Sequence, residues 1–193
     1  MRANGASWDK VAICSGHTID APDRKEPRFP QAKAEAVRAK IALQLAQWEM
    51  GAGDLAICGG ASGADLLFAE ECLSRGAQIR LLLAQRVDDF VRASVLPGGE
   101  EWVRRFHTMR AKAEVEILPA NSSAESNENS IYARNNLWII ETAQAEAGDP
   151  GKIFALLVWD EKPTGDGPGG TSDFQKKVNR LGGQFQIINP TKL

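Results

Sequence analysis

The stretch 59–65 reads GGASGAD and lies between a short apolar run and a helical pattern. Glycines at such a junction leave backbone N–H groups open to a ligand, and the first turn of a helix adds the positive end of its dipole. Gly59, Gly60, Ser62, Gly63 and Asp65 are therefore predicted to bind the phosphate or ribose of a ligand. The stretch is not a Walker A loop, because no Lys-Ser or Lys-Thr pair follows it. The alternative is a capping box formed by Ser62 and Asp65.

A second glycine-rich junction follows the apolar run 153–159, and its end, 167–173, reads GPGGTSD. Two such loops at one edge of a sheet can hold a single anionic ligand between them. Gly169, Gly170, Thr171 and Ser172 are therefore predicted ligand contacts. The alternative is an ordinary surface loop that ends in a capping box of Ser172 and Gln175.

The first apolar run ends in Ser-Gly-His-Thr and is followed by a loop rich in proline and charge. Gly16 would let a ligand approach the backbone, and His17 is a candidate acid, base or ligand contact. Arg28 and its neighbours Arg24 and Lys25 can meet a phosphate. The alternative for His17 is a hydrogen-bonded structural histidine, and for the cations it is a solvated surface loop.

A late helical pattern begins with the residues Ser-Ile-Tyr-Ala-Arg-Asn-Asn. Its N-terminal end faces the same sheet edge, so Arg134 is predicted to reach a phosphate and Asn135 a sugar or base. Tyr132, Trp138 and Trp159 lie near this edge and can stack on a base. Core packing is the more frequent role of such aromatic side chains, above all for Trp138 in its apolar run.

Short apolar runs alternate with helical patterns along the chain, which is typical of βαβ units and a parallel sheet. Several runs are continuously apolar, as strands covered by helices on both faces are. We expect a doubly wound, mostly parallel six-stranded α/β sheet with helices on both faces, in which ligands bind at the carboxyl ends of the strands. The predicted strands are 10–15, 54–58, 78–84, 115–118, 153–159 and 184–188.

Five helical regions connect these strands. The first places Val37, Ile41, Leu45 and Trp48 on one apolar stripe, and the third is broken at the Leu-Pro-Gly-Gly sequence that begins at Leu96. The apolar run 137–140 belongs to a helix, because the whole segment is too long for a strand. The predicted helical regions are 31–50, 64–75, 87–113, 130–147 and 171–181.

The composition is that of one ordinary globular domain, which we place at residues 1–193. A net charge of -2 supplies no general attraction for nucleic acid. Cys14, Cys58 and Cys72 have neither disulfide nor zinc spacing, so we expect a reducing cytoplasm, buried thiols and no metal or other cofactor. No apolar run is long enough to span a membrane, and the first residues lack a signal peptide.

The order of the glycine turn, GGASGAD, YARNN and PGGTSDF resembles the SLOG superfamily over about residues 11–189. This Rossmann-like group includes the DNA-processing protein A fold, the "lonely guy" phosphoribohydrolases and ligand-sensing domains of bacterial conflict systems. The resemblance implies a Rossmann-like fold that binds a nucleotide-derived small molecule, and it also implies a homodimer.

The phosphoribohydrolases carry an arginine on the late helix and a PGG-x-GT loop followed by an acidic residue. Arg134 matches that arginine, but the x-G step before Thr171 is missing and Asp173 is the only carboxylate nearby. The first expected function is therefore a sensing or regulatory domain for a nucleotide-derived ligand. The second is an N-glycoside hydrolase of a nucleoside monophosphate that uses Arg134 and Asp173, and the third is single-stranded DNA binding.

Overall fold

A computed structural model of the chain describes residues 7–119, 131–162 and 170–193. Its six strands form one parallel sheet in the order β4-β3-β2-β1-β5-β6, and the sheet stays open because its two edge strands do not pair. The architecture is the predicted Rossmann-like α/β fold. The strands are β1 (Val11–Gly16), β2 (Leu55–Cys58), β3 (Gln78–Leu83), β4 (Glu114–Ile117), β5 (Ile153–Val158) and β6 (Gln184–Ile188).

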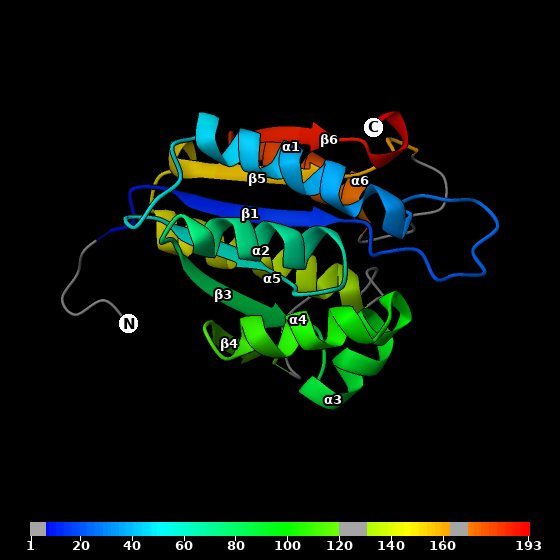
Figure 1. The fold of residues 1–193 in the computed structure, drawn as a ribbon. Coiled ribbons are helices and arrows are strands. Elements are labelled where there is room, and N and C mark those ends of the chain that lie inside the picture. The colour runs from blue at the N-terminus through cyan, green and yellow to red at the C-terminus, as the bar shows by residue number, and fades with distance from the viewer. Residues whose placement is uncertain (1–6, 120–130, 163–169) are drawn as a thin grey trace.

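Helices cover both faces of the sheet. In Figure 1, α1 and α2 lie in front of the strands and α5 and α6 lie behind them. Alternate strand residues divide accordingly: Ala12 and Cys14 belong to the core under α1, α2 and α4, while Val11 and Ile13 belong to the core under α5 and α6. The helices are α1 (Ala34–Gln47), α2 (Ala64–Ser74), α4 (Glu100–Arg110), α5 (Ile131–Ala147) and α6 (Thr171–Arg180).

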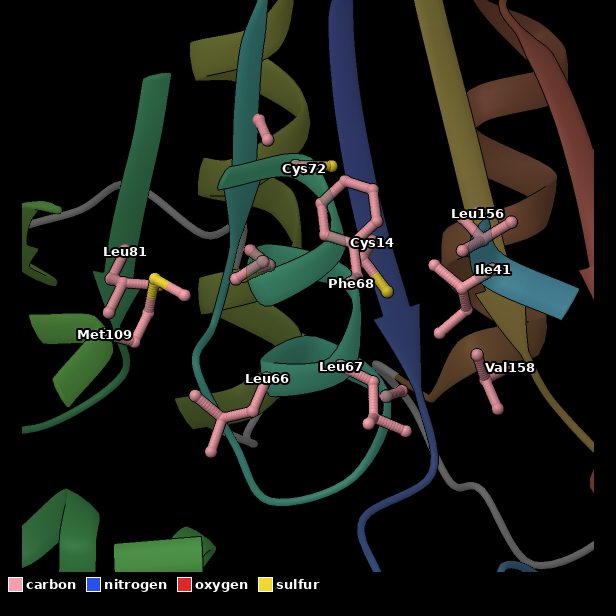
Figure 2. Packing of buried hydrophobic residues seen from close by; sticks show 14 of the residues in the cluster. Cys14, Ile41, Leu66, Leu67, Phe68, Cys72, Leu81, Met109, Leu156 and Val158 are labelled. Atoms are coloured by element: carbon pink, nitrogen blue, oxygen red, sulfur yellow. The ribbon is translucent and has the colours of Figure 1, made fainter. Parts of the chain in front are cut away.

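The core on the first face is built from the predicted apolar stripes. Figure 2 shows Ile41 of α1 and Phe68 of α2 close to Cys14 of β1, and all three side chains are buried. Burial of each large side chain stabilises the fold by about 1.5–3 kcal/mol. The cysteines behave as small apolar residues, since all three are buried and unpaired and burial raises the pKa of each thiol.

The third helical region is broken where the Leu-Pro-Gly-Gly sequence predicted it. The short helix α3 (Val87–Phe90) continues as one π-helical turn over Val91–Val95 and a 3-10 turn over Leu96–Gly98. Gly99 then has φ of 105° and begins α4. The π-helical turn was not predicted, and such turns occur often at functional sites.

The element boundaries differ only slightly from those expected. Residues 31–33 form a separate 3-10 turn before α1, and Trp48 packs on Phe154 from just beyond the end of that helix. Residues 137–140 are helical, as the length of the segment predicted. In the described part of the chain, no helix is both long and apolar enough to cross a membrane.

The chain winds in two directions from β1. Strands β2, β3 and β4 follow on one side of it, and α5 then carries the chain to β5 and β6 on the other side. The loops after β1 and β5 consequently diverge to opposite faces of the sheet, which is the arrangement that opens a crevice for a ligand.

Candidate functional site

A cavity of about 360 Å³ lies at the carboxyl ends of the central strands. It extends from the β5 and β1 ends, past β2, to the residues that follow β3, and α5 forms part of its wall. Of the predicted contacts, this cavity brings together seven: Gly16, His17, Gly59, Asp65, Asn135, Gly170 and Thr171.

The amides of the glycine-rich loop after β2 converge on the carboxylate of Asp65. The Ala61 N–H donates to Asp65 Oδ2 at 3.1 Å, and the Gly59 and Gly60 amides also lower the pKa of this carboxyl. Burial raises the pKa of Asp65 to about 7, against the opposing effect of these amides. The chain therefore supplies its own anion to the loop that was predicted to receive a phosphate.

The alternative considered for this loop, a capping box of Ser62 and Asp65, is wrong. The residue that caps α2 is Gly63, which has no side chain to accept a bond, and the Ser62 hydroxyl instead donates to the Ser94 carbonyl at 3.2 Å. The Asp65 carboxyl instead accepts a hydrogen bond from Ala61, in the loop that precedes the helix. Ser62, Gly60 and Gly63 do not belong to the cavity wall.

Two glycines are required by close packing around the cavity. Gly63 has φ of 91°, and a Cβ there would lie 2.8 Å from the Ile19 nitrogen. At Gly16, a Cβ would lie 2.6 Å from that of Ala64. Gly63 thus lets the start of α2 meet the loop after β1, and Gly16 lets the end of β1 approach the same helix.

Asn135 and Asp65 both lie close to Gly59. A Cβ on Gly59 would be 2.9 Å from Asp65 Oδ2 and 3.6 Å from Asn135 Nδ2. The Asn135 amide nitrogen donates to the Leu82 carbonyl at 2.9 Å. Its Oδ1 is buried and has no hydrogen-bond partner among the described residues, a situation that costs about 1–3 kcal/mol.

His17 pairs with Asp160 where the strand order reverses. His17 Nε2 lies 3.0 Å from Asp160 Oδ1, and Arg28 Nε lies 3.9 Å from Oδ2. Burial raises the pKa of Asp160, but the bonds from His17 and the Lys162 amide and the charge of Arg28 outweigh it and lower the pKa overall. His17 and Arg28 both line the cavity, so this end of it combines the Arg28 cation with the buried Asp160 carboxylate behind it.

Asp160 was not among the predicted site residues. The sequence did contain an indication of its role. Asp160 directly follows a continuous apolar strand, and a side chain at that position lies at the ligand-binding edge of the sheet.

The junction before α6 contributes two residues to the cavity. Gly170 and Thr171 line it, and Thr171 is buried. The helix is capped by Gly170 without a side-chain bond, so the alternative capping box of Ser172 and Gln175 is wrong. Ser172 and Asp173 lie outside the wall, and Asp173 pairs with Lys177 at 3.1 Å. Gly169 lies outside the described residues.

Arg134 does not line the cavity, although its helix does. Its guanidinium donates to the Pro119 carbonyl at 3.2 Å. Tyr132, from the same first turn, does line the cavity and has 45% of its surface exposed. Trp138 packs against the core under α5 and α6, and Trp159 is buried, which confirms the core-packing alternative for both.

Part of the cavity wall comes from α3 and the π-helical turn, which were not predicted to belong to the site. Phe90, Ala93 and Ser94 line the cavity. The Ser62 amide donates to the Ser94 carbonyl at 3.0 Å, and the Ser94 hydroxyl lies 3.3 Å from that of Tyr132. These residues belong to no recognisable sequence motif. The only feature that indicates a functional role for them is the π-helical turn, which appears in the structure alone.

No protein-family profile and no curated protein sequence matches the chain. Among solved structures, the chain is similar to DNA processing protein A (DprA) from Streptococcus pneumoniae, with 15% sequence identity and a TM-score of 0.32. The match covers 93% of this chain but only 58% of that protein. The assignment to the Rossmann-like class rests on the strand order of the sheet itself.

Proposed function

We propose that this chain binds a nucleotide-derived, phosphate-bearing small molecule in the cavity at the carboxyl ends of β1, β2 and β5, and acts as a sensing domain through binding. The observation that carries the proposal is the cavity wall, which joins the cationic side chain of Arg28 to the carboxyl group of Asp65 and to Asn135. A volume of about 360 Å³ is within the range of small-molecule sites. The reversal of strand order is where such sheets bind nucleotides.

The features that support binding of a phosphate lie at the β1 and β5 end. Arg28 can form charge-assisted hydrogen bonds, and the first turn of α6 presents Gly170 and the Thr171 side chain. Helix α6 also directs the positive end of its dipole toward this part of the cavity. The ligand that fits these groups is an organic molecule with at least one anionic group.

Hydrolysis of an N-glycosidic bond does not enter the proposal. That alternative depends on Arg134 and Asp173, and neither residue belongs to the cavity wall. A catalytic carboxylate must lie within hydrogen-bond reach of the reacting group, whereas Asp173 pairs with Lys177. Release of free base from nucleoside monophosphates, at a rate abolished by Asp173→Ala, would restore the hydrolase.

The test is thermal unfolding with millimolar nucleoside mono- and diphosphates and dinucleotides. A ligand at a hundred times its Kd stabilises the folded state by about 2.7 kcal/mol, which corresponds to roughly 5–10 °C in Tm for a domain of this size. Arg28→Ala is expected to reduce the shift. Arg24→Ala is the matched control, because Arg24 lies in the same loop but outside the cavity and pairs with Asp20.

Two outcomes decide the proposal. A nucleotide that raises Tm in the unmodified protein and less in Arg28→Ala supports it, and mass spectrometry of small molecules released on denaturation can identify the natural ligand. If no compound in the panel raises Tm, the chain is not a nucleotide-binding domain.

A further inference from the structure

The glycine-rich loop after β2 already holds a carboxylate. The Ala61 amide donates to Asp65 Oδ2 at 3.1 Å, and the amides of Gly59 and Gly60 also lower the pKa of this carboxyl against the effect of burial. A phosphate in the same place would compete for these amides and lie against a second anion. Like charges a few ångströms apart repel strongly away from bulk water. An anionic ligand group is therefore excluded from this loop whenever Asp65 is ionised.

The neighbouring side chain of Asn135 is held in place by a buried hydrogen bond. Its amide nitrogen donates to the Leu82 carbonyl, and its Oδ1 is buried without a partner among the described residues. Asn135 is 95% buried and lies in the cavity wall, close to Gly59. The acceptor that a ligand can reach at this end of the cavity is therefore the carboxyl group of Asp65, which is partly exposed and lines the cavity.

The opposite end has the reverse character. The loops after β1 and β5 place Arg28 and the first turn of α6 in the wall, and both favour negative charge. Strand β1 lies between β5 and β2 in the sheet, so these groups and the Asp65 loop face the cavity from different strand ends. The cavity is therefore electrically asymmetric along the sheet edge.

We infer that the Asp65 end of the cavity binds an uncharged hydrogen-bond-donating part of the ligand, while the anionic part lies beside Arg28 and the start of α6. This inference rests on the proposed function and fixes the direction of the bound ligand. In a nucleotide, the donors that fit are the vicinal hydroxyls of the ribose or an exocyclic amine of the base. The pKa of Asp65, raised to about 7, means that ionised Asp65 accepts such donors at slightly alkaline pH.

The first experiment compares ligands in the unmodified protein by calorimetry at pH 8. The probes are AMP, IMP, which lacks the amine, and 2′,3′-dideoxy-AMP, which lacks the hydroxyls. A loss of about tenfold or more in affinity for the dideoxy probe identifies the ribose hydroxyls, since one hydrogen bond to a charged acceptor is worth about 1.5–3 kcal/mol. A similar loss for IMP identifies the amine. Equal affinity for all three probes overturns the inference but leaves the proposed function intact.

The second experiment changes the charge of the loop. Asp65→Asn keeps an acceptor for the Ala61 amide but removes the negative charge, and Asp173→Asn is a matched control outside the cavity wall. We expect Asp65→Asn to weaken AMP about tenfold and to leave competition by inorganic phosphate unchanged, whereas Arg28→Ala weakens that competition. If Asp65→Asn instead strengthens phosphate binding, the loop is an anion site and the inference is wrong. Absence of binding by every probe contradicts the proposed function itself.

Discussion

Two strand-to-helix junctions of this protein are similar in sequence and different in structure. GGASGAD after β2 and GPGGTSD after β5 both combine glycines, a serine and an aspartate at the start of a helix. Asp65 turns back to accept the amides of its own loop, whereas Asp173 pairs with Lys177 one turn along α6. The first junction presents acceptors to the cavity, and the second presents Gly170 and Thr171.

The difference arises from one step along the helix. Asp65 is the second residue of α2, which begins at Ala64, and Asp173 is the third residue of α6, which begins at Thr171. One residue corresponds to a rotation of about 100° about a helix axis. An aspartate in the first turn therefore either occupies the amides in front of the helix or leaves them to a ligand, depending on its position.

The largest expected effect is a difference in the free energy of unfolding between glycine-to-alanine substitutions at the two junctions. Gly63→Ala forces alanine to a φ of 91° and brings its Cβ to 2.8 Å from the Ile19 nitrogen, so we expect a loss of about 3 kcal/mol or more in the free energy of unfolding. Gly170 has φ of −75°, a value that alanine adopts readily. Gly170→Ala should change stability by less than about 0.5 kcal/mol, and urea unfolding of both variants measures the contrast. Comparable losses in the two would show that the junctions are equally strained.

The next effect is a difference in the stability lost when the aspartate of each junction is replaced by alanine. Asp65→Ala removes the acceptor of the Ala61 amide and the carboxyl group that faces the Gly59 and Gly60 amides, and we expect it to cost about 2 kcal/mol at pH 6. Asp173→Ala removes only a partly exposed ion pair with Lys177, which is worth about 0.5 kcal/mol or less. Chemical unfolding at fixed pH compares the variants. A larger loss for Asp173→Ala than for Asp65→Ala would reverse the assigned roles.

The third expected effect is a pH dependence that belongs to the first junction. The pKa of Asp65 is raised from 3.8 to about 7, so the folded chain retains a proton that the unfolded chain has lost between these values. The contribution of this residue to stability is complete below about pH 3.8 and is lost as the pH rises to about 7, with a slope of at most about 1.4 kcal/mol per pH unit. Asp65 is partly exposed to the cavity, and solvent screening there narrows the pH range over which this slope holds.

Unfolding of the unmodified protein and Asp65→Asn between pH 4 and pH 8 measures this slope as the difference between the two curves. Carboxyls with a lowered pKa, such as Asp160, give a stability change of the opposite sign. Because they are present in both proteins, their contribution cancels in the difference between the two curves. Asp173→Asn should retain the slope of the unmodified protein. Parallel curves for the unmodified protein and Asp65→Asn would show that Asp65 does not titrate in this range.

Much of the fold was predictable because it depends on local patterns. All six strands lie within about one residue of their predicted ends, and β6 matches at both ends. The stripe formed by Val37, Ile41 and Leu45 is buried as predicted. Continuous apolar runs and helical spacing encode burial directly, so a single sequence contains this information.

The site was predictable in part, for a related reason. The loops that follow parallel strands must meet at one edge, and Gly16, Gly59 and Thr171 accordingly line the same cavity. Arg134 was predicted in the site because it lies in the first turn of a helix that faces this edge. Its side chain instead bonds the Pro119 carbonyl, a direction that helix position alone does not define.

The sequence by itself determined the parallel sheet, the reversal of strand order and the segments that gather at its carboxyl edge. Only the tertiary structure decided that Asp65 occupies its own loop and that Ser94 completes the wall. It also decided that His17 meets Asp160, 143 residues away. The physical reason is that periodicity reports which face of an element is buried, whereas the direction of a polar side chain depends on partners brought near by folding.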